Sequence, residues 1–280
     1  MKKSIPFLLL ATLQISCGSY QEKPDVIQKE EKTIALSPKE MLAEAYQLFK
    51  EGKDHESVVL AERVLAIGKE TKNDTLIGRA LTSLCRNAQR NMDTNRLAEL
   101  SEGLKSLAQT SGNKKWMMYR AHQNAEMWRL VGNLERAEKF YIESMELSSE
   151  TGSKGMFMID HFNKSFVSTG KGDFEEAARL ISKYYELRRE LDSTSEDAYG
   201  LIALCYLLEQ KANYSGAHEV ALVTRRLFKE QNLFPEPPDE KPLLAVEAKV
   251  KEELSNSDYD AIKETAQNES VSSLLEKYLK

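Results

Sequence analysis

The sequence predicts an all-α solenoid of helix-turn-helix repeats with a period of about forty residues. Three columns of residues recur at this spacing. The turn column holds Gly52, Met92, Gly132, Gly172 and Ala212. The small residues seven positions earlier are Ala45, Cys85, Ala125, Ser165 and Cys205. The branched aliphatic residues fifteen positions later are Ile67, Leu107, Leu147, Leu187 and Leu227. A fixed period of this length is typical of stacked units that contact only their neighbours.

The third unit shows how each repeat is read as two helices. The first helix is expected over residues 115–131 and the second over 135–149, with a break at Gly132-Asn133. Glycine and asparagine adopt the backbone conformation that a chain reversal requires. The second helix carries an apolar stripe at helical spacing. Its members are Ala137, Tyr141, Ser144, Met145 and Leu147.

These features resemble the tetratricopeptide repeat, over residues 37–232. That family has a small residue midway along the first helix, a glycine at the turn and an alanine early in the second helix. In the third repeat these places are taken by Ala125, Gly132 and Ala137. The spacing of forty exceeds the usual period of about thirty-four, and the family's closing proline is absent. The resemblance implies a right-handed superhelix whose first helices line a concave face.

The boundaries of the repeat region follow from capping and proline signals. Ser37-Pro38-Lys39-Glu40 is a capping box with proline at the first helical position. Pro235, Pro237, Pro238 and Pro242 are expected to break the chain after the fifth repeat. Residues 233–280 would then form a proline-rich loop, a degenerate sixth hairpin (243–254 and 258–266) and a capping helix.

The first residues predict a lipoprotein signal. Residues 1–16 combine a basic start with an apolar run of eleven residues, which is too short to span a bilayer. The segment ending in Ser16-Cys17 resembles a bacterial lipoprotein signal, although Gln14 stands where leucine is preferred. Cys17 would then be lipidated, with residues 17–36 as a flexible tether. Gly18 favours the outer membrane, facing the periplasm. The alternative is ordinary cleavage and a secreted or soluble periplasmic protein.

Composition narrows the function. The net charge of −5 argues against nonspecific binding to nucleic acid. Cys85 and Cys205 share a column three repeats apart, so they are read as small core residues. The sequence lacks a nucleophile elbow, a phosphate loop and a Cys-x-x-Cys cluster. His122 and Glu126 lie four residues apart and are expected to form a surface pair rather than a metal site. We therefore expect no enzymatic activity and no cofactor.

One set of residues is a candidate binding groove, because the repeat register places it on the concave face. A basic stripe is expected at one end and aromatic side chains toward the other. The alternative is a solvated arginine face with aromatic residues packed between repeats. The candidates are Arg79, Arg86, Gln89, Arg90, Tyr119, His122, Arg129, Phe162, Phe166 and Tyr206.

Guanidinium groups suit carboxylates and phosphates, and exposed aromatic rings suit a peptide or a partner helix. The sequence thus favours a noncatalytic scaffold that binds a protein or peptide with an anionic segment and is anchored to a bacterial membrane. The alternative is a sensor of a peptide or small anionic ligand that signals through a separate partner.

Overall fold

The computed structural model describes residues 36–192, 197–235 and 237–280, and the chain divides into units at Met1–Ser37 and Pro38–Lys280. The predicted signal segment, Cys17 and almost all of the tether lie outside the described residues. Within the described ranges there are thirteen α-helices, one short 3-10 helix and no strand. The predicted all-α class is confirmed. Among these helices, none is both long and apolar enough to cross a membrane.

The second unit is a run of paired helices, most of them seventeen residues long. The described helices are α2 (Pro38–Lys50), α3 (Asp54–Glu70), α4 (Asp74–Arg90), α5 (Thr94–Ser111), α6 (Lys114–Leu130), α7 (Leu134–Glu150), α8 (Lys154–Gly170), α9 (Phe174–Glu190), α10 (Asp197–Gln210), α11 (Tyr214–Glu230), α12 (Pro237–Glu253), α13 (Asn256–Thr265), η2 (Ala266–Asn268) and α14 (Val271–Leu279).

The turns repeat at half the predicted period. A left-handed residue ends a helix every twenty residues, alternately within a repeat and between repeats. These residues are Gly52, Lys72, Met92, Gly112, Gly132, Gly152, Gly172, Asp192, Ala212 and Asn232. The forty-residue turn column is therefore every second member of a twenty-residue series. A residue with a side chain is strained at φ near +50°, where glycine is favoured. Half of these positions nevertheless hold a residue other than glycine.

The residue after the left-handed position caps both helices in five of these turns. The Asn73 amide N–H donates back to the Gly68 carbonyl at 2.8 Å, which caps the end of α3. The Asn73 side chain then accepts from the Leu76 N–H at 3.1 Å, which caps the start of α4. Asp93, Asn133, Asp173 and Asn213 repeat both contacts. The three residues between α3 and α4 thus reverse the chain. The last of them, Asn73, also satisfies one carbonyl at the end of α3 and one N–H at the start of α4.

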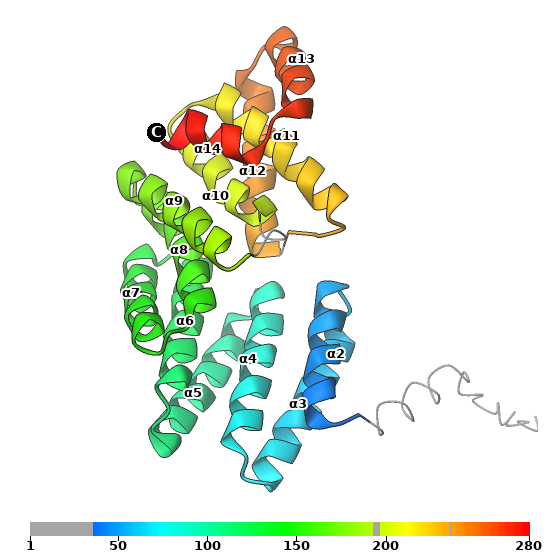
Figure 1. Cartoon of the computed structure of the whole chain (residues 1–280), viewed down its shortest axis with the longest axis vertical. Helices are drawn as coiled ribbons and strands as arrows, with labels where there is room; N and C mark the ends of the chain where they lie inside the picture. Colours follow the sequence, from blue (N-terminus) through cyan, green and yellow to red (C-terminus); the bar gives the residue numbers. More distant parts are fainter. Residues whose placement is uncertain (1–35, 193–196, 236) are drawn as a thin grey trace, which may run out of the picture. The chain divides into compact units, whose positions relative to one another are not determined.

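Consecutive helices pack against one another, and neighbouring first helices also contact each other from α2 to α10 (Figure 1). The small-residue column lies at these contacts. Ala125 and Ser165 have no exposed surface, as the register predicts. Cys85 and Cys205 are likewise buried and unpaired, which confirms that they are core residues.

The C-terminal segment differs from the expected layout. Helix α12 begins at Pro237 and contains Pro242, so the prolines start a helix rather than keep the chain irregular. Pro237 and Pro238 are tolerated because first-turn N–H groups have no helical partner, whereas Pro242 is the sixth residue of the helix and lacks the N–H that would bond within it. Helix α12 contacts α10, α11 and also α4, which is far away in sequence. Helix α14 turns back onto α9 and α11 (Figure 1), where Lys277 pairs with Glu219.

Candidate ligand-binding groove

A cavity of about 250 Å³ runs across the inner faces of the first helices α2, α4, α6, α8 and α10. Residues from α9 and from the start of α12 complete its wall. Its wall combines aromatic, polar and a few aliphatic side chains, and few of them are charged. The lining consists of Tyr46, Phe49, Thr82, Arg86, Gln89, Tyr119, His122, Gln123, Met156, Ile159, Phe162, Asn163, Tyr184, Tyr199 and Asp239.

Half of the predicted groove residues lie on this wall. The structure brings together Arg86, Gln89, Tyr119, His122 and Phe162. The other five lie elsewhere on or beneath the inner face: Arg79, Arg90, Arg129, Phe166 and Tyr206. Whether any of them contacts a ligand stays a prediction.

The three arginines of α4 have different surroundings. Arg86 is half-buried, with its guanidinium 4.8 Å from the centre of the Tyr46 ring and 5.7 Å from that of Phe49. It makes no ion pair within the described part of the chain. Arg90 lies over the Phe49 ring at 3.6 Å, pairs with Asp54 at 3.3 Å and donates to the Phe49 carbonyl. Arg79 is exposed and outside the lining.

Arg129 belongs to a buried charge cluster beneath the groove. Its guanidinium lies 2.8 Å from the Glu126 carboxylate and 3.8 Å from that of Asp239 in α12. Glu126 also accepts hydrogen bonds from Gln89 at 2.6 Å and from the Tyr141 hydroxyl. Burial opposes ionisation of Glu126, but the charges of Arg129 and His122 and the hydrogen bonds from Arg129 and Tyr141 together outweigh it and hold the pKa of that carboxyl below its usual value. Arg129 is therefore held by this chain's own carboxylates.

The aromatic pair that was expected in the groove packs beside this cluster. Phe166 stacks against Tyr206 at 6.0 Å and lies 5.5 Å from the Arg129 guanidinium. Phe162, which does line the cavity, contacts Phe166 edge-to-face at 5.1 Å. Phe166 and Tyr206 thus support the wall from behind.

The expected surface pair of His122 and Glu126 is wrong, because both side chains are buried. His122 instead contacts Asp160 of α8, with Nδ1 2.7 Å from Oδ1. The other Asp160 oxygen accepts from the Ser144 hydroxyl at 2.6 Å. Burial disfavours charge on His122, but the hydrogen bond and charge of Asp160 outweigh it and raise its pKa. The four-residue spacing indicates that His122 and Glu126 share a face of one helix. It cannot predict contacts with other helices, such as that of His122 with Asp160.

Serine, histidine and aspartate meet here, but not in the order that acyl transfer needs. In a catalytic triad the histidine lies between the serine, which it deprotonates, and the acid. Here Asp160 lies between Ser144 and His122, so the imidazole cannot take the serine proton directly. Ser144 is also fully buried. The described residues contain no cluster of three potential metal ligands.

Two buried amides are the part of the wall that the groove prediction missed. Gln123 is 4% exposed, and its Oε1 is buried without a hydrogen-bond partner. Asn163 is 5% exposed and also makes no side-chain hydrogen bond within the described ranges. The two residues are forty apart, so they occupy the same register position of α6 and α8. A search for polar residues recurring at the repeat period would have found them.

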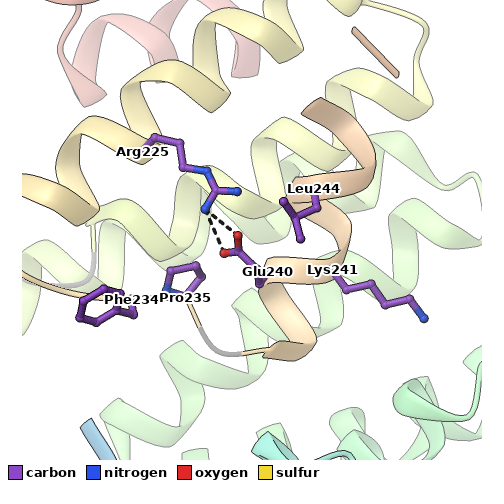
Figure 2. Close-up of a pocket in the computed structure, with 6 residues that line it drawn as sticks. All are labelled: Arg225, Phe234, Pro235, Glu240, Lys241 and Leu244. Carbon is purple, nitrogen blue, oxygen red and sulfur yellow. Dashed lines mark hydrogen bonds and ion pairs between the residues drawn. The ribbon is translucent and has the colours of Figure 1, made fainter. Parts of the chain in front are cut away.

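A second hollow of about 560 Å³ lies beside α12 and is lined by Arg225, Phe234, Pro235, Glu240, Lys241 and Leu244. Figure 2 shows the Arg225 guanidinium directed at the Glu240 carboxylate, 2.7 Å away. Glu247 accepts from the same guanidinium at 2.6 Å. Arg225 and Glu240 are thus paired with each other, whereas Lys241 makes no ion pair among the described residues. Phe234, at 69% exposed, projects into solvent.

One of the comparisons with known proteins, a solved structure, supports the fold. No protein-family model matches the chain. No curated protein matches it either. Among solved structures, the apo form of RapI has a TM-score of 0.50 and 13% identity, and the match covers 81% of this chain and 90% of RapI. TPR-like repeats of a putative kinesin light chain from Podosopora anserina give a TM-score of 0.45 at 16% identity, covering 70% of this chain and 98% of that chain.

Proposed function

We propose that this chain, which has a tetratricopeptide-like repeat fold, is a noncatalytic scaffold that binds a protein or peptide segment in the groove of its first helices. The observation that carries the proposal is the continuity of the lining, which draws on five successive first helices. A wall that mixes aromatic and polar side chains suits an extended segment, because rings supply contact area and polar groups fix orientation.

The groove also supports the alternative of a sensor for a small peptide or anionic ligand. A cavity of about 250 Å³ is smaller than most sites for drug-sized ligands, which occupy roughly 300–1,000 Å³. Helix α12 contacts α4 and reaches the wall with Asp239, so a ligand could shift its position. Ligand-dependent movement of α12 would favour the sensor over the scaffold.

We also propose that Cys17 anchors the chain to a bacterial membrane, with the outer membrane favoured. The support is the signal-like order of residues 1–17. A single acyl chain binds membranes only marginally, and several give stable anchoring. The mature N-terminus of the native protein should therefore be a lipidated Cys17, detectable by mass spectrometry. Cys17→Ala should release the protein from membranes, and an unmodified terminus at Gly18 or later would reject the anchor.

Peptide selection tests the groove. The purified protein is used to select from a phage library of random twelve-residue peptides, and selected sequences are synthesised and measured by calorimetry. Tyr119→Ala changes the cavity wall and should weaken binding at least about tenfold, because aromatic anchors commonly contribute more than about 1 kcal/mol. Ile142→Ala changes an exposed residue of α7, 44% exposed, and serves as the matched control.

Two outcomes would count against the scaffold. If no peptide is selected while amino acids, dicarboxylates or tripeptides raise the thermal midpoint, the sensor is the better account. If peptides bind Tyr119→Ala and wild type equally, the site lies outside the groove.

A further inference from the structure

We infer that the groove takes an acidic peptide, with a carboxylate on Arg86 and a main-chain amide against Gln123 and Asn163. This inference rests on the proposed function and names the ligand class of the same site. Three side chains from three successive first helices carry it, and all three line one cavity.

Arg86 supplies the charge requirement. Arg90 and Arg129 are already paired with Asp54 and Glu126, respectively. Arg86 is half-buried on the cavity wall, contacts the Tyr46 and Phe49 rings, and makes no ion pair within the described ranges. A partly desolvated guanidinium binds a carboxylate strongly, because its hydrogen bonds are charge-assisted and two-pronged. The chain as a whole is acidic, so the rest of its surface repels polyanions. Arg86 is therefore the position that selects an acidic ligand.

The Gln123 amide supplies the hydrogen-bonding requirement. A buried carbonyl oxygen without a donor costs about 1–3 kcal/mol, which a ligand N–H would recover. The Gln123 oxygen is such an acceptor, and the Gln123 nitrogen makes no hydrogen bond with the described chain. An amide side chain offers one acceptor and a donor pair. This set matches the N–H and C=O of a peptide main chain and does not match a simple dicarboxylate.

Asn163 extends the same pattern by one repeat. Its amide occupies the Gln123 position of the next first helix and borders the cavity. The corresponding residues of the second and fifth repeats are Ser83 and Ala203, which carry no amide. Main-chain recognition is therefore confined to the two central repeats. The Arg86 side chain lies on the helix before them, so the acidic ligand residue should adjoin the recognised amide.

The charge arm of the test uses a peptide selected from a random hexapeptide phage library and its Glu→Gln or Asp→Asn analogue. Wild type should bind the acidic form at least about tenfold more tightly, and the difference should shrink with added salt because exposed parts of the pair are screened. Arg86→Met should lose the discrimination. Arg79→Met is the matched control, since Arg79 lies on the same helix outside the cavity and should retain it.

The main-chain arm replaces each peptide amide by an ester in turn, which removes one N–H donor. Wild type should lose roughly tenfold at one position, and Gln123→Leu should show no loss there, because the two changes remove the same hydrogen bond. Circular dichroism and the thermal midpoint establish that each variant is folded. Asn163→Leu provides a second variant if Gln123→Leu does not fold.

The outcomes separate this inference from the function on which it rests. Failure to select any peptide would count against peptide binding itself. Selected peptides without an acidic position, or with equal affinity for the Glu and Gln forms, would overturn the Arg86 assignment. Equal ester sensitivity in wild type and both amide variants would overturn the role of Gln123 and Asn163.

Discussion

Helices α6 and α10 are the first helices of the third and fifth repeats, and their inner faces are opposite in character. In α6 the buried set includes His122, Gln123 and Glu126. Eighty residues later the matching positions of α10 hold Ile202, Ala203 and Tyr206, and every buried residue of α10 is apolar or glycine. The same helical repeat therefore forms whether its inner face is polar or apolar.

The cover over each helix explains the difference. Leu243, Val246 and Val250 of α12 join Ile202 in one apolar cluster, so the inner face of α10 is sealed by another helix. The corresponding face of α6 borders the cavity. An apolar face is stable only when it is covered, whereas a polar face remains compatible with water and ligands. The centre of the chain is thus suited to recognition, and its C-terminal part to stability.

The largest expected effect is in the polar centre. Glu126→Leu removes the carboxylate that holds Arg129 and leaves a buried cation, which should cost about 3–5 kcal/mol in the free energy of unfolding. Denaturant titration measures the loss. The double variant Glu126→Leu with Arg129→Met removes both charges and should be less destabilised than the single variant. Equal losses would show that the charge pair is not the source.

A slightly smaller effect is expected in the apolar end. Ile202→Ala should leave a cavity under α12 and cost about 2–5 kcal/mol, because Ile202 is fully buried. The matched change is Leu244→Ala on α12, which is half exposed and should cost little. A loss below about 1 kcal/mol for Ile202→Ala would mean that α12 does not seal α10.

The small-residue column tests whether the two regions share one packing frame. Ala125→Leu and Cys205→Leu enlarge the same repeat position at the polar centre and the apolar end. Each should cost about 1–3 kcal/mol or more, since both sites are fully buried and overpacking forces the backbone to shift. Thermal unfolding of the two variants gives the comparison. Wild-type stability in either would show that the helix contact there is loose.

The stability of the polar centre, unlike that of the apolar C-terminal part, should depend on pH through His122. Because the pKa of His122 is raised in the folded chain, its contribution is complete below the unfolded value of about 6.5 and is lost as pH rises through the folded value. The free energy of unfolding should therefore fall above about pH 6.5, by at most about 1.4 kcal/mol per pH unit for one proton. His122→Gln should flatten this slope, and an unchanged slope would assign it to another group.

The smallest effect concerns the turns. Ala212 and Met92 have φ of 56° and 53°. Replacing either by glycine should relieve strain and stabilise the chain by up to about 1 kcal/mol, partly offset by the flexibility of glycine when unfolded. Gly132→Ala is the reverse control and should destabilise. Melting temperatures of the three variants decide the point.

The sequence predicted the repeat frame because glycine, small residues and aliphatics recur in columns. It missed the twenty-residue turn series because Lys72, Asp192 and Asn232 occupy left-handed positions without a shared residue type. Each of these residues donates its backbone N–H to a carbonyl of the preceding helix.

The candidate groove was predicted in part for a related reason. Helical register placed Arg86, Tyr119 and Phe162 on the inner face, where the cavity lies. It could not find Asp239, because the contact with Arg129 joins residues 110 positions apart across a proline-rich segment. Nor could it separate Arg86 from Arg90, since Asp54, which pairs with Arg90, lies on another helix.

The twenty-residue turn series makes the helix, rather than the repeat, the smallest interchangeable part of this chain. Deleting forty residues between two equivalent turns would remove one inner and one outer helix and leave every later helix on its own side. Deleting twenty would send each later inner helix outward. The apolar face of α10 would then meet solvent, and the cavity would be lined by residues selected for the outside. Length changes in such a chain are therefore tolerated in even numbers of helices, and gene duplication would be constrained to the same unit.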